Sequence, residues 1–258
     1  MPEGDTVHLA GTRLRAALAG RELTRTEFRV PRYATLDLAG QRVDDVASHG
    51  KHLLIRLSGG VTIHTHYRME GAWHLYRHGE RWQGPAWQVR ALLENAERVA
   101  VGFRLPVLDV LDTRREADVI GHLGPDPLAS HWDAEDALRR LLADPQRPIF
   151  DALLDQRVIA GIGNVYRCEI CFLRGIDPWT PVDAVRNPAA LVALVKRLFE
   201  ANRQLGSQIT TGDLRPGYER WVYGRAGAPC RRCRTPIQRQ GDEERVTYWC
   251  PHCQPAVK

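Results

Sequence analysis

The sequence predicts an α+β protein of several domains, in which a β-sandwich with a flanking helix precedes a helical domain and a small cysteine-rich module. Three observations support this prediction. Short strand-like runs bounded by turn signals fill residues 23–111, apolar residues recur at helical spacing in residues 133–198, and four cysteines form two C-x-x-C pairs near the end. We expect the domains and linker to span residues 1–120, 121–130 (linker), 131–220 and 221–258.

The first segment combines one helix with a series of strands. Val7, Ala10, Leu14 and Leu18 recur at helical spacing, and Gly20 lies where a C-cap belongs. The runs that follow are too short for helices and are rich in β-branched and aromatic residues. We expect strands at residues 23–30, 42–48, 52–57, 61–66, 73–76, 87–93, 99–103 and 107–111.

The second segment is helical. Asp133 is placed to cap one helix, residues 149–157 form another, and Asn187 precedes a proline that suits the first turn of a further helix. Between them, two glycines in residues 161–163 break the chain, and Asn164 is expected to cap the next helix, which runs to about residue 174. This pattern fits a helix–two-turn–helix unit, whose second helix would point free N–H groups at an anion such as a phosphate.

The third segment has the spacing of a metal site. Cys230 and Cys233 form one C-x-x-C pair, and Cys250 and Cys253 form another after 16 intervening residues. This spacing is typical of a four-cysteine structural zinc site, so His252 is expected to be a bystander. Two disulfides are the alternative, but we find no signal peptide and expect a reducing cytosol.

The charge pattern favours a polyanionic partner. The net charge is +5, the isoelectric point is near 9.0, and only Lys51, Lys196 and Lys258 of the 36 basic residues are lysine. Arginine forms forked hydrogen bonds with phosphate, so the surface suits a nucleic-acid backbone. A basic protein without such a partner would have the same composition. No apolar run approaches the roughly 18 residues of a membrane span.

The start of the chain, Pro2-Glu3-Gly4, offers two reactive groups. Proline is small, so we expect removal of Met1 and a free secondary amine on Pro2. An α-amine titrates near pH 8, and its unprotonated form can attack an aldehyde-level carbon to give an iminium. Glu3 supplies a carboxyl group that can assist a departing group by proton transfer. A Pro-Glu start without any function is the alternative.

Four motifs in this order resemble the formamidopyrimidine-DNA glycosylase / endonuclease VIII family: Pro2-Glu3-Gly4, residues 50–54 (GKHLL), residues 160–166 (AGIGNVY) and residues 245–254 (RVTYWCPHCQ). The resemblance implies a base-excision DNA glycosylase that also cleaves the strand by β,δ-elimination. It implies a β-sandwich and a helical domain that ends in a β-hairpin zinc finger with one structural Zn2+. Damaged DNA is the implied partner.

The resemblance also assigns roles to single residues. Pro2 matches the nucleophile that attacks C1′ of the damaged nucleoside and forms a Schiff base, and Glu3 matches the acid beside it. Lys51 matches the lysine of phosphate binding and elimination. Asn164 matches a phosphate-binding asparagine, and Arg245 matches the zinc-finger arginine that grips the phosphate flanking the lesion.

The segment at residues 67–71 (YRMEG) aligns with the family's intercalating loop. A base that leaves the duplex must be replaced in the stack, and Met69 is an apolar wedge with limited help from Arg68. An ordinary core position is the alternative for Met69. His64 and His66 alternate on the preceding strand, and we interpret them as structural or solvent-facing rather than as metal ligands.

The sequence departs from the family pattern at three positions, and two of these departures favour one branch of the family. Gly4 stands where the purine-preferring branch has leucine. Glu116 stands where that branch has a phenylalanine wedge, although Arg114, an expected DNA contact, is retained. Thr6 replaces the usual glutamate near the amine. Gly4 and Glu116 favour the endonuclease VIII branch and oxidised pyrimidines, because an anionic side chain is a poor wedge between bases.

Two other functions stay open from sequence alone. One is a purine-type glycosylase acting on formamidopyrimidine and 8-oxoguanine, and the other is a catalytically silent DNA-binding zinc protein. The intact Pro2, Glu3 and Lys51 argue against the silent protein. We expect a monomer in the bacterial cytoplasm that works at the nucleoid.

Overall fold

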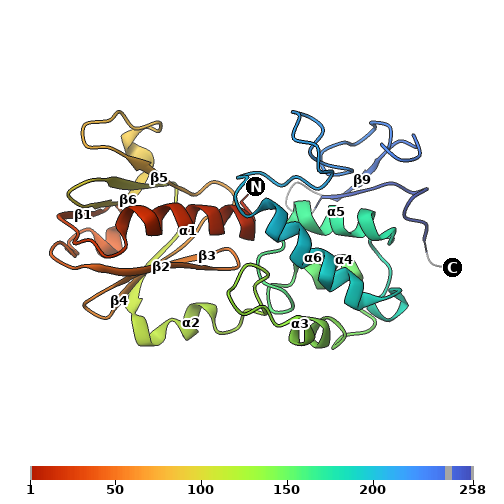
Figure 1. Ribbon diagram of the computed structural model, residues 1–258, viewed down its shortest axis with the longest axis horizontal. Helices are drawn as coiled ribbons and strands as arrows, with labels where there is room; N and C mark the ends of the chain where they lie inside the picture. Colours follow the sequence, from red (N-terminus) through yellow and green to blue (C-terminus); the bar gives the residue numbers. More distant parts are fainter. Residues whose placement is uncertain (1, 242–245, 257–258) are drawn as a thin grey trace. The chain divides into compact units, whose positions relative to one another are not determined.

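The computed structural model describes residues 2–241 and 246–256, and it divides into two compact units. The first unit contains Pro2 and Thr6–His122, and the second contains Leu123–Lys258. Glu3–Asp5 belong to the second unit, although in sequence they lie between Pro2 and Thr6 of the first. Figure 1 shows the elements of each unit. No helix in the described part of the chain combines the length and apolarity needed to cross a membrane.

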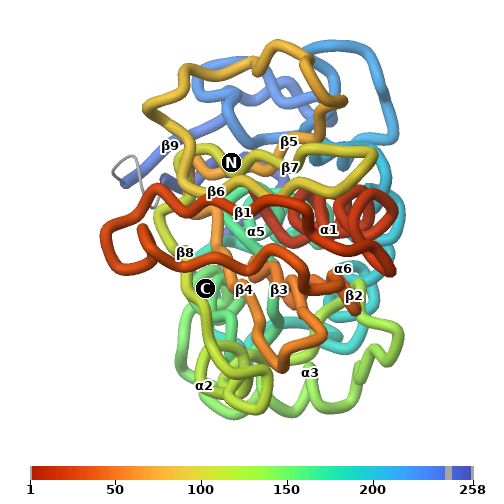
Figure 2. Tube along the Cα trace, turned by 90° about the vertical axis from the view of Figure 1, so that its left-hand side faces the viewer, coloured from red at the N-terminus to blue at the C-terminus, as the bar shows by residue number. Residues whose placement is uncertain are grey.

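The first unit is a β-sandwich of two four-stranded antiparallel sheets with helix α1 (Gly4–Leu18) beside them (Figures 1 and 2). Val7, Leu14 and Leu18 of α1 share one apolar core with side chains of both sheets, which explains their helical spacing. One sheet has the strand order β1-β6-β7-β5 and the other β2-β3-β4-β8. The strands are β1 (Arg25–Phe28), β2 (Val43–His49), β3 (His52–Leu57), β4 (Val61–His66), β5 (Ala72–Tyr76), β6 (Val89–Glu94), β7 (Val99–Phe103) and β8 (Val107–Asp112).

The eight expected strands are therefore confirmed, with small differences at their ends. Strand β6 begins two residues late, because Ala86–Gln88 form the short 3-10 helix η2 after Pro85. Two further short helices, η3 (Thr113–Arg115) and α2 (Ala117–Ile120), follow β8, and η1 (Pro31–Tyr33) follows β1.

The second unit contains four main helices around one apolar core: α3 (Ala134–Leu141), α4 (Ile149–Leu154), α5 (Asn164–Arg174) and α6 (Pro188–Asn202). The expected side-chain caps are confirmed at Asp133, which accepts from the Asp136 N–H, and at Asn187, which accepts from the Ala190 N–H. Helix α4 is shorter than expected, because the Asp155 side chain accepts from the Arg157 N–H and closes a turn. The short helix η4 (Val182–Ala184) precedes α6.

The chain ends in the expected antiparallel ribbon, formed by β9 (Gln238–Gln240) and β10 (Thr247–Trp249). Cys250 follows β10 directly and lies in the core that surrounds α5. The buried side chain of Gln254 accepts from the Cys250 N–H and donates to the Ile176 carbonyl. These bonds fasten the last cysteine pair to the chain just beyond the C-terminal end of α5.

Candidate catalytic residues and metal site

Glu3 is fixed by backbone N–H groups at the start of helix α5. Its side chain is fully buried, and its two carboxylate oxygens accept from the N–H groups of Gly163 and Val165, each at 2.7 Å, and of Tyr166 at 3.4 Å. Unpaired N–H groups and the positive end of the helix dipole both suit a carboxylate at this position. The side chain that caps α5 thus comes from a residue more than 150 positions away in the sequence.

This arrangement corrects two expectations. Asn164 does not cap α5, because Gly163 occupies the N-cap position without a side-chain bond and Asn164 is the first helical residue. The N–H groups of Gly163, Val165 and Tyr166 are not free for a phosphate, because Glu3 already occupies them. Sequence reasoning recognised an anion site at this helix end but not the anion that fills it.

Gly4 and Asp5 are bonded to other residues of the second unit. The Gly4 N–H donates to the Gly161 carbonyl at 2.9 Å, and a Cβ on Gly4 would lie only 2.8 Å from the Gly161 Cα. Asp5 is buried and accepts from the Tyr166 hydroxyl at 2.8 Å and from Gln208 at 3.3 Å. The close backbone approach explains why this chain has glycine rather than leucine at position 4. The sequence analysis did not identify Asp5.

Lys51 lies in the two-residue turn between β2 and β3. Gly50 has φ +56°, which glycine adopts readily, and His49 pairs with His52 across the turn. Lys51 is half-buried. Burial is the main cause that lowers the pKa of His66 to about 4, and the positive charge of Lys51 is the next cause. The expected elimination lysine therefore lies beside neutral imidazole groups.

Arg68 and Met69 lie in the exposed loop between β4 and β5. Met69 is 57% exposed, which excludes the core position considered as its alternative. Arg68 has φ +45°, and its N–H donates to His66 Nδ1 at 3.0 Å. The Gly71 N–H donates to the Tyr67 carbonyl, which closes the loop. The loop exposes one apolar side chain, Met69, between a cation, Arg68, and an anion, Glu70.

Arg114 and Glu116 follow β8 but face different partners. Arg114 is exposed and folds back on the Asp112 carboxylate. Glu116 is mostly buried and accepts two hydrogen bonds from Arg56 at 2.8 Å and one from Thr62 at 2.7 Å. Burial raises the pKa of Glu116, but these bonds outweigh burial and lower it below its ordinary value. Glu116 therefore binds inward, away from any position where a wedge could act.

Asn164 is buried and bonded within the protein through both side-chain atoms. Its Nδ2 donates to the Val246 carbonyl at 2.9 Å, and its Oδ1 accepts from Arg167 Nε at 2.7 Å. Val246 precedes strand β10, so Asn164 fixes the start of that strand. Arg245 and Met1, two further subjects of the sequence analysis, lie outside the described residues.

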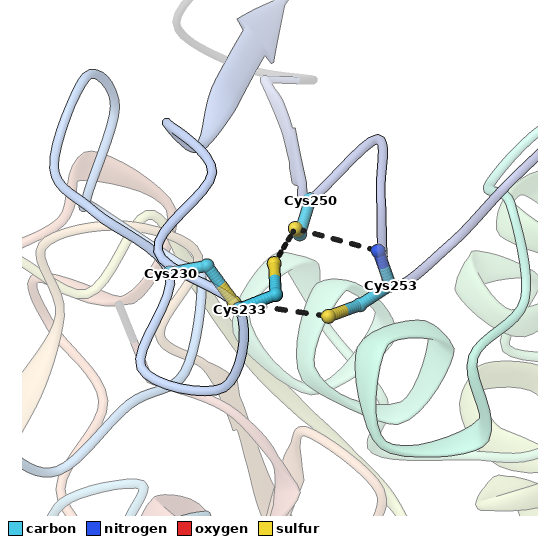
Figure 3. A group of neighbouring side chains, drawn as sticks. All are labelled: Cys230, Cys233, Cys250 and Cys253. Carbon is cyan, nitrogen blue, oxygen red and sulfur yellow. Dashed lines mark hydrogen bonds between the residues drawn. The ribbon is translucent and has the colours of Figure 1, made fainter.

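The four cysteines of the C-terminal module converge as expected (Figure 3). Their Sγ atoms all lie within 4.8 Å of one another, with 3.4 Å between Cys233 and Cys250 and 3.9 Å between Cys230 and Cys253. A Zn–S bond of about 2.3 Å in a tetrahedron gives an S–S separation of about 3.8 Å, so the donor set and its spacing fit zinc. All four are free thiols rather than disulfides.

Another buried carboxylate, Glu169, is a feature that sequence reasoning missed. It lies in the middle of α5, fully buried, and accepts from the consecutive N–H groups of Trp221, Val222 and Tyr223 at 2.8 Å each and from the Thr210 hydroxyl. Charged residues in helices usually face solvent, so the sequence gave no signal of this role. Glu169 fixes the segment that leads into the cysteine module.

Three segments of the chain match known protein families. Residues 1–115 match the formamidopyrimidine-DNA glycosylase N-terminal domain, residues 123–210 match the H2TH domain of the same glycosylases, and residues 227–256 match the zinc finger found in FPG and IleRS. The chain belongs to the formamidopyrimidine-DNA glycosylase / endonuclease VIII family.

Relatives that are at least 50% identical to this chain are named as endonuclease 8 and as an abasic-site lyase. The chain is 56% identical over 261 residues to a probable endonuclease 8 2 of Streptomyces coelicolor, covering 98% of this chain and 94% of the relative. It is 50% identical to the DNA-(apurinic or apyrimidinic site) lyase Nei2 of Mycolicibacterium smegmatis, and the match covers 99% of this chain and 100% of the relative. The Lactococcus lactis Fpg in complex with abasic-site DNA has the same fold, with a TM-score of 0.81 at 21% identity. The match covers 98% of this chain and 100% of the Fpg chain.

Proposed function

We propose that the protein is a bifunctional DNA glycosylase and abasic-site lyase that removes oxidised bases, pyrimidines above all, and then cleaves the strand by β,δ-elimination. The observation that carries the proposal is the immobilised carboxylate of Glu3, one residue after an N-terminal proline. A nucleophilic amine and an acid–base group are the two parts that Schiff-base release of a base needs. Relatives at 50–56% identity are named as endonuclease 8 and abasic-site lyase.

In the proposed reaction, the lone pair of the Pro2 amine attacks C1′, the C1′–N bond to the damaged base breaks, and the amine loses its proton. The C1′–O4′ bond of the sugar ring then opens to give the iminium, and O4′ takes up a proton. Glu3 acts as the acid–base group that assists the departing base. Loss of a proton from C2′ then expels the 3′ phosphate, and a second elimination expels the 5′ phosphate. Lys51 binds the DNA phosphate and takes part in these elimination steps.

DNA binding is assigned to side chains on both units. Met69 fills the gap left by the extruded nucleotide with help from Arg68. Arg114 binds the DNA backbone once it has been released from its ion pair with Asp112. Arg245 grips the phosphate beside the lesion. Asn164 supports this contact by holding the neighbouring Val246, since its side-chain amide is already bonded there.

The preference for oxidised pyrimidines rests on the loss of a second wedge. Glu116 occupies the place of an aromatic side chain and is bonded to Arg56 and Thr62. Met69 then acts as a single wedge, so it replaces less of the stacking that is lost when the base leaves the duplex. Extrusion costs least for a base that is already poorly stacked, and a saturated pyrimidine ring is non-planar.

One Zn2+ bound by Cys230, Cys233, Cys250 and Cys253 would hold the finger together and supply no step of the reaction. A segment of this size has little core of its own, so metal binding and folding are coupled. We further propose that the protein works as a monomer in the bacterial cytoplasm, on the nucleoid.

Borohydride trapping on lesion-bearing oligonucleotides tests the proposal. The processed protein should cross-link to abasic-site DNA, whereas a protein with residues added ahead of Pro2 should not, because its proline nitrogen is then an amide. Equal trapping by both proteins would exclude Pro2 as the nucleophile. Single-turnover excision of thymine glycol, dihydrouracil and 5-hydroxyuracil should exceed that of 8-oxoguanine opposite cytosine, and the reverse order would place the protein with the purine enzymes.

A further inference from the structure

Four polar side chains form a ladder on one face of the sheet that contains β3, β4 and β8. His52 lies directly opposite His66 on the neighbouring strand, and His64 lies directly opposite Asp109. His64 and His66 are two residues apart and therefore share a face. The ladder begins at the residue after Lys51 and ends at Asp109 on β8.

The members of the ladder are in contact. His52 Nδ1 lies 2.9 Å from His64 Nε2, and the His52 and His66 ring centroids are 4.7 Å apart. His64 Nδ1 lies 3.7 Å from a carboxylate oxygen of Asp109, an ion-pair distance. His64 is only 3% exposed, and within the described part of the chain its Nδ1 has no hydrogen-bond partner. Of the two interpretations considered for His64, structural or solvent-facing, its burial supports the structural one.

These contacts fix the proton positions on three rings. His66 Nδ1 accepts from the Arg68 N–H, so its own proton is on Nε2. Asp109 is the acceptor nearest to His64 Nδ1, which places the proton of His64 on Nδ1 and leaves Nε2 as an acceptor. His52 must then donate from Nδ1 and retain a lone pair on Nε2. Burial lowers the pKa of His52 to about 3 and that of His66 to about 4, so both rings are neutral at pH 7.

His52 and His64 therefore share one polarity, with the donor side of His64 facing Asp109 and a lone pair left on His52 Nε2. The His52 ring contacts His66, whose Nδ1 lone pair accepts from Arg68, and the charges of Lys51 and Arg68 both act on His66. Such aligned dipoles stabilise an anion at one end and cations at the other, as a helix dipole does.

We propose that Asp109 and His64 are positioning residues that orient the imidazole ladder so that its lone-pair end stabilises two cations, Lys51 of the β2–β3 turn and Arg68 of the β4–β5 loop, for binding the DNA phosphate. The inference deepens the proposed function and rests on the phosphate-binding role assigned there to Lys51. Asp109 also lies 3.6 Å from Arg32, so it carries a surface ion pair in addition.

Asp109→Asn provides the test. An asparagine can turn its N–H groups toward His64 Nδ1, which would move the His64 proton to Nε2 and the His52 proton to Nε2 as well. Asp44→Asn is the matched control, because Asp44 is a half-exposed carboxylate of the same sheet that pairs with Arg42. Both substitutions change the net charge equally, so they have the same effect on non-specific attraction to DNA.

We expect Asp109→Asn to raise the KM for abasic-site DNA about three- to tenfold relative to Asp44→Asn, with kcat within twofold. The effect should disappear in a His64→Gln background, because the two residues act through one path. A KM equal to that of the control, or an effect that persists without His64, would overturn the proposal. If the wild-type protein fails to trap or cleave, the proposed function fails instead.

Nitrogen-15 spectra of labelled histidine test the ladder without any activity. The wild-type protein should have the protons of His52 and His64 on Nδ1 and that of His66 on Nε2. In Asp109→Asn, the protons of His52 and His64 should move to Nε2 while His66 keeps its tautomer. A proton on Nε2 of His64 in the wild-type protein would refute the assignment.

Discussion

Replacing Glu3 by glutamine should destabilise the second unit, apart from any effect on catalysis. The carboxylate accepts three N–H bonds, two of them at 2.7 Å, and the amide group of glutamine has one acceptor atom instead of two. At least one short bond to a charged acceptor is lost, and an NH2 group then faces a backbone N–H.

The expected cost follows from these contacts. A hydrogen bond to a charged group contributes about 1.5–3 kcal/mol, and a negative charge at a helix N-terminus contributes about 0.3–2 kcal/mol. We expect Glu3→Gln to lower the free energy of unfolding by about 2–4 kcal/mol. In a unit of this size that corresponds to a fall in Tm of roughly 6–12 °C.

Equilibrium urea unfolding and calorimetry would measure the change. Glu135→Gln is a suitable control, because Glu135 also lies in the first turn of a helix but is exposed. It should cost less than about 1 kcal/mol. Glu3→Gln should also impair base release more than cleavage of a preformed abasic site, compared at a temperature where both proteins are folded. A Tm within a degree of the wild-type value would show that the N–H cradle does not hold the carboxylate.

Three further predictions concern the pH dependence, the buried ion pair and the metal. His52 and His66 have folded-state pKa values below their unfolded value of about 6.5. The free energy of unfolding of the first unit should therefore stay constant above pH 6.5 and fall by about 2–3 kcal/mol by pH 5.5, as measured by urea unfolding. A free energy that does not change with pH would contradict the burial of the two rings. Glu116→Gln should leave Arg56 with only Asp45 as its partner and cost the first unit about 2 kcal/mol, while the melting of the second unit stays unchanged. Cys250→Ser or zinc removal should unfold the finger and abolish lesion-DNA affinity while the sandwich remains folded; active protein without stoichiometric zinc would refute this.

Local patterns predicted the elements well and long-range polar contacts poorly. The eight strands and the caps at Asp133 and Asn187 follow from alternation and from side chains that bond within a few residues. Glu3 could not be placed, because its N–H partners lie at the start of α5 and no local pattern marks a pairing across such a separation. Sequence alone left His64 either structural or solvent-facing for a related reason, since alternation marks a strand face but not what covers it.

The cysteine site illustrates the opposite case. Spacing alone identified all four cysteines, because each C-x-x-C turn places two thiols together whatever the rest of the fold does. Asn164 was expected to cap α5 and to bind phosphate, whereas its side chain bonds to Val246, a contact that depends on how β10 meets α5. Motifs that act within one turn are readable from sequence, whereas those that join distant elements require the coordinates.

The inward-facing Glu116 constrains how this lineage could change its substrate. A single substitution of Glu116 by phenylalanine would not restore a wedge at low cost, because Arg56 would lose its bidentate partner and stay half-buried. Arg56 would have to change as well, and neither substitution is favourable alone. A two-step path through a less stable intermediate is slow, so a protein with this ion pair is expected to keep the lesion preference proposed above over long periods of divergence.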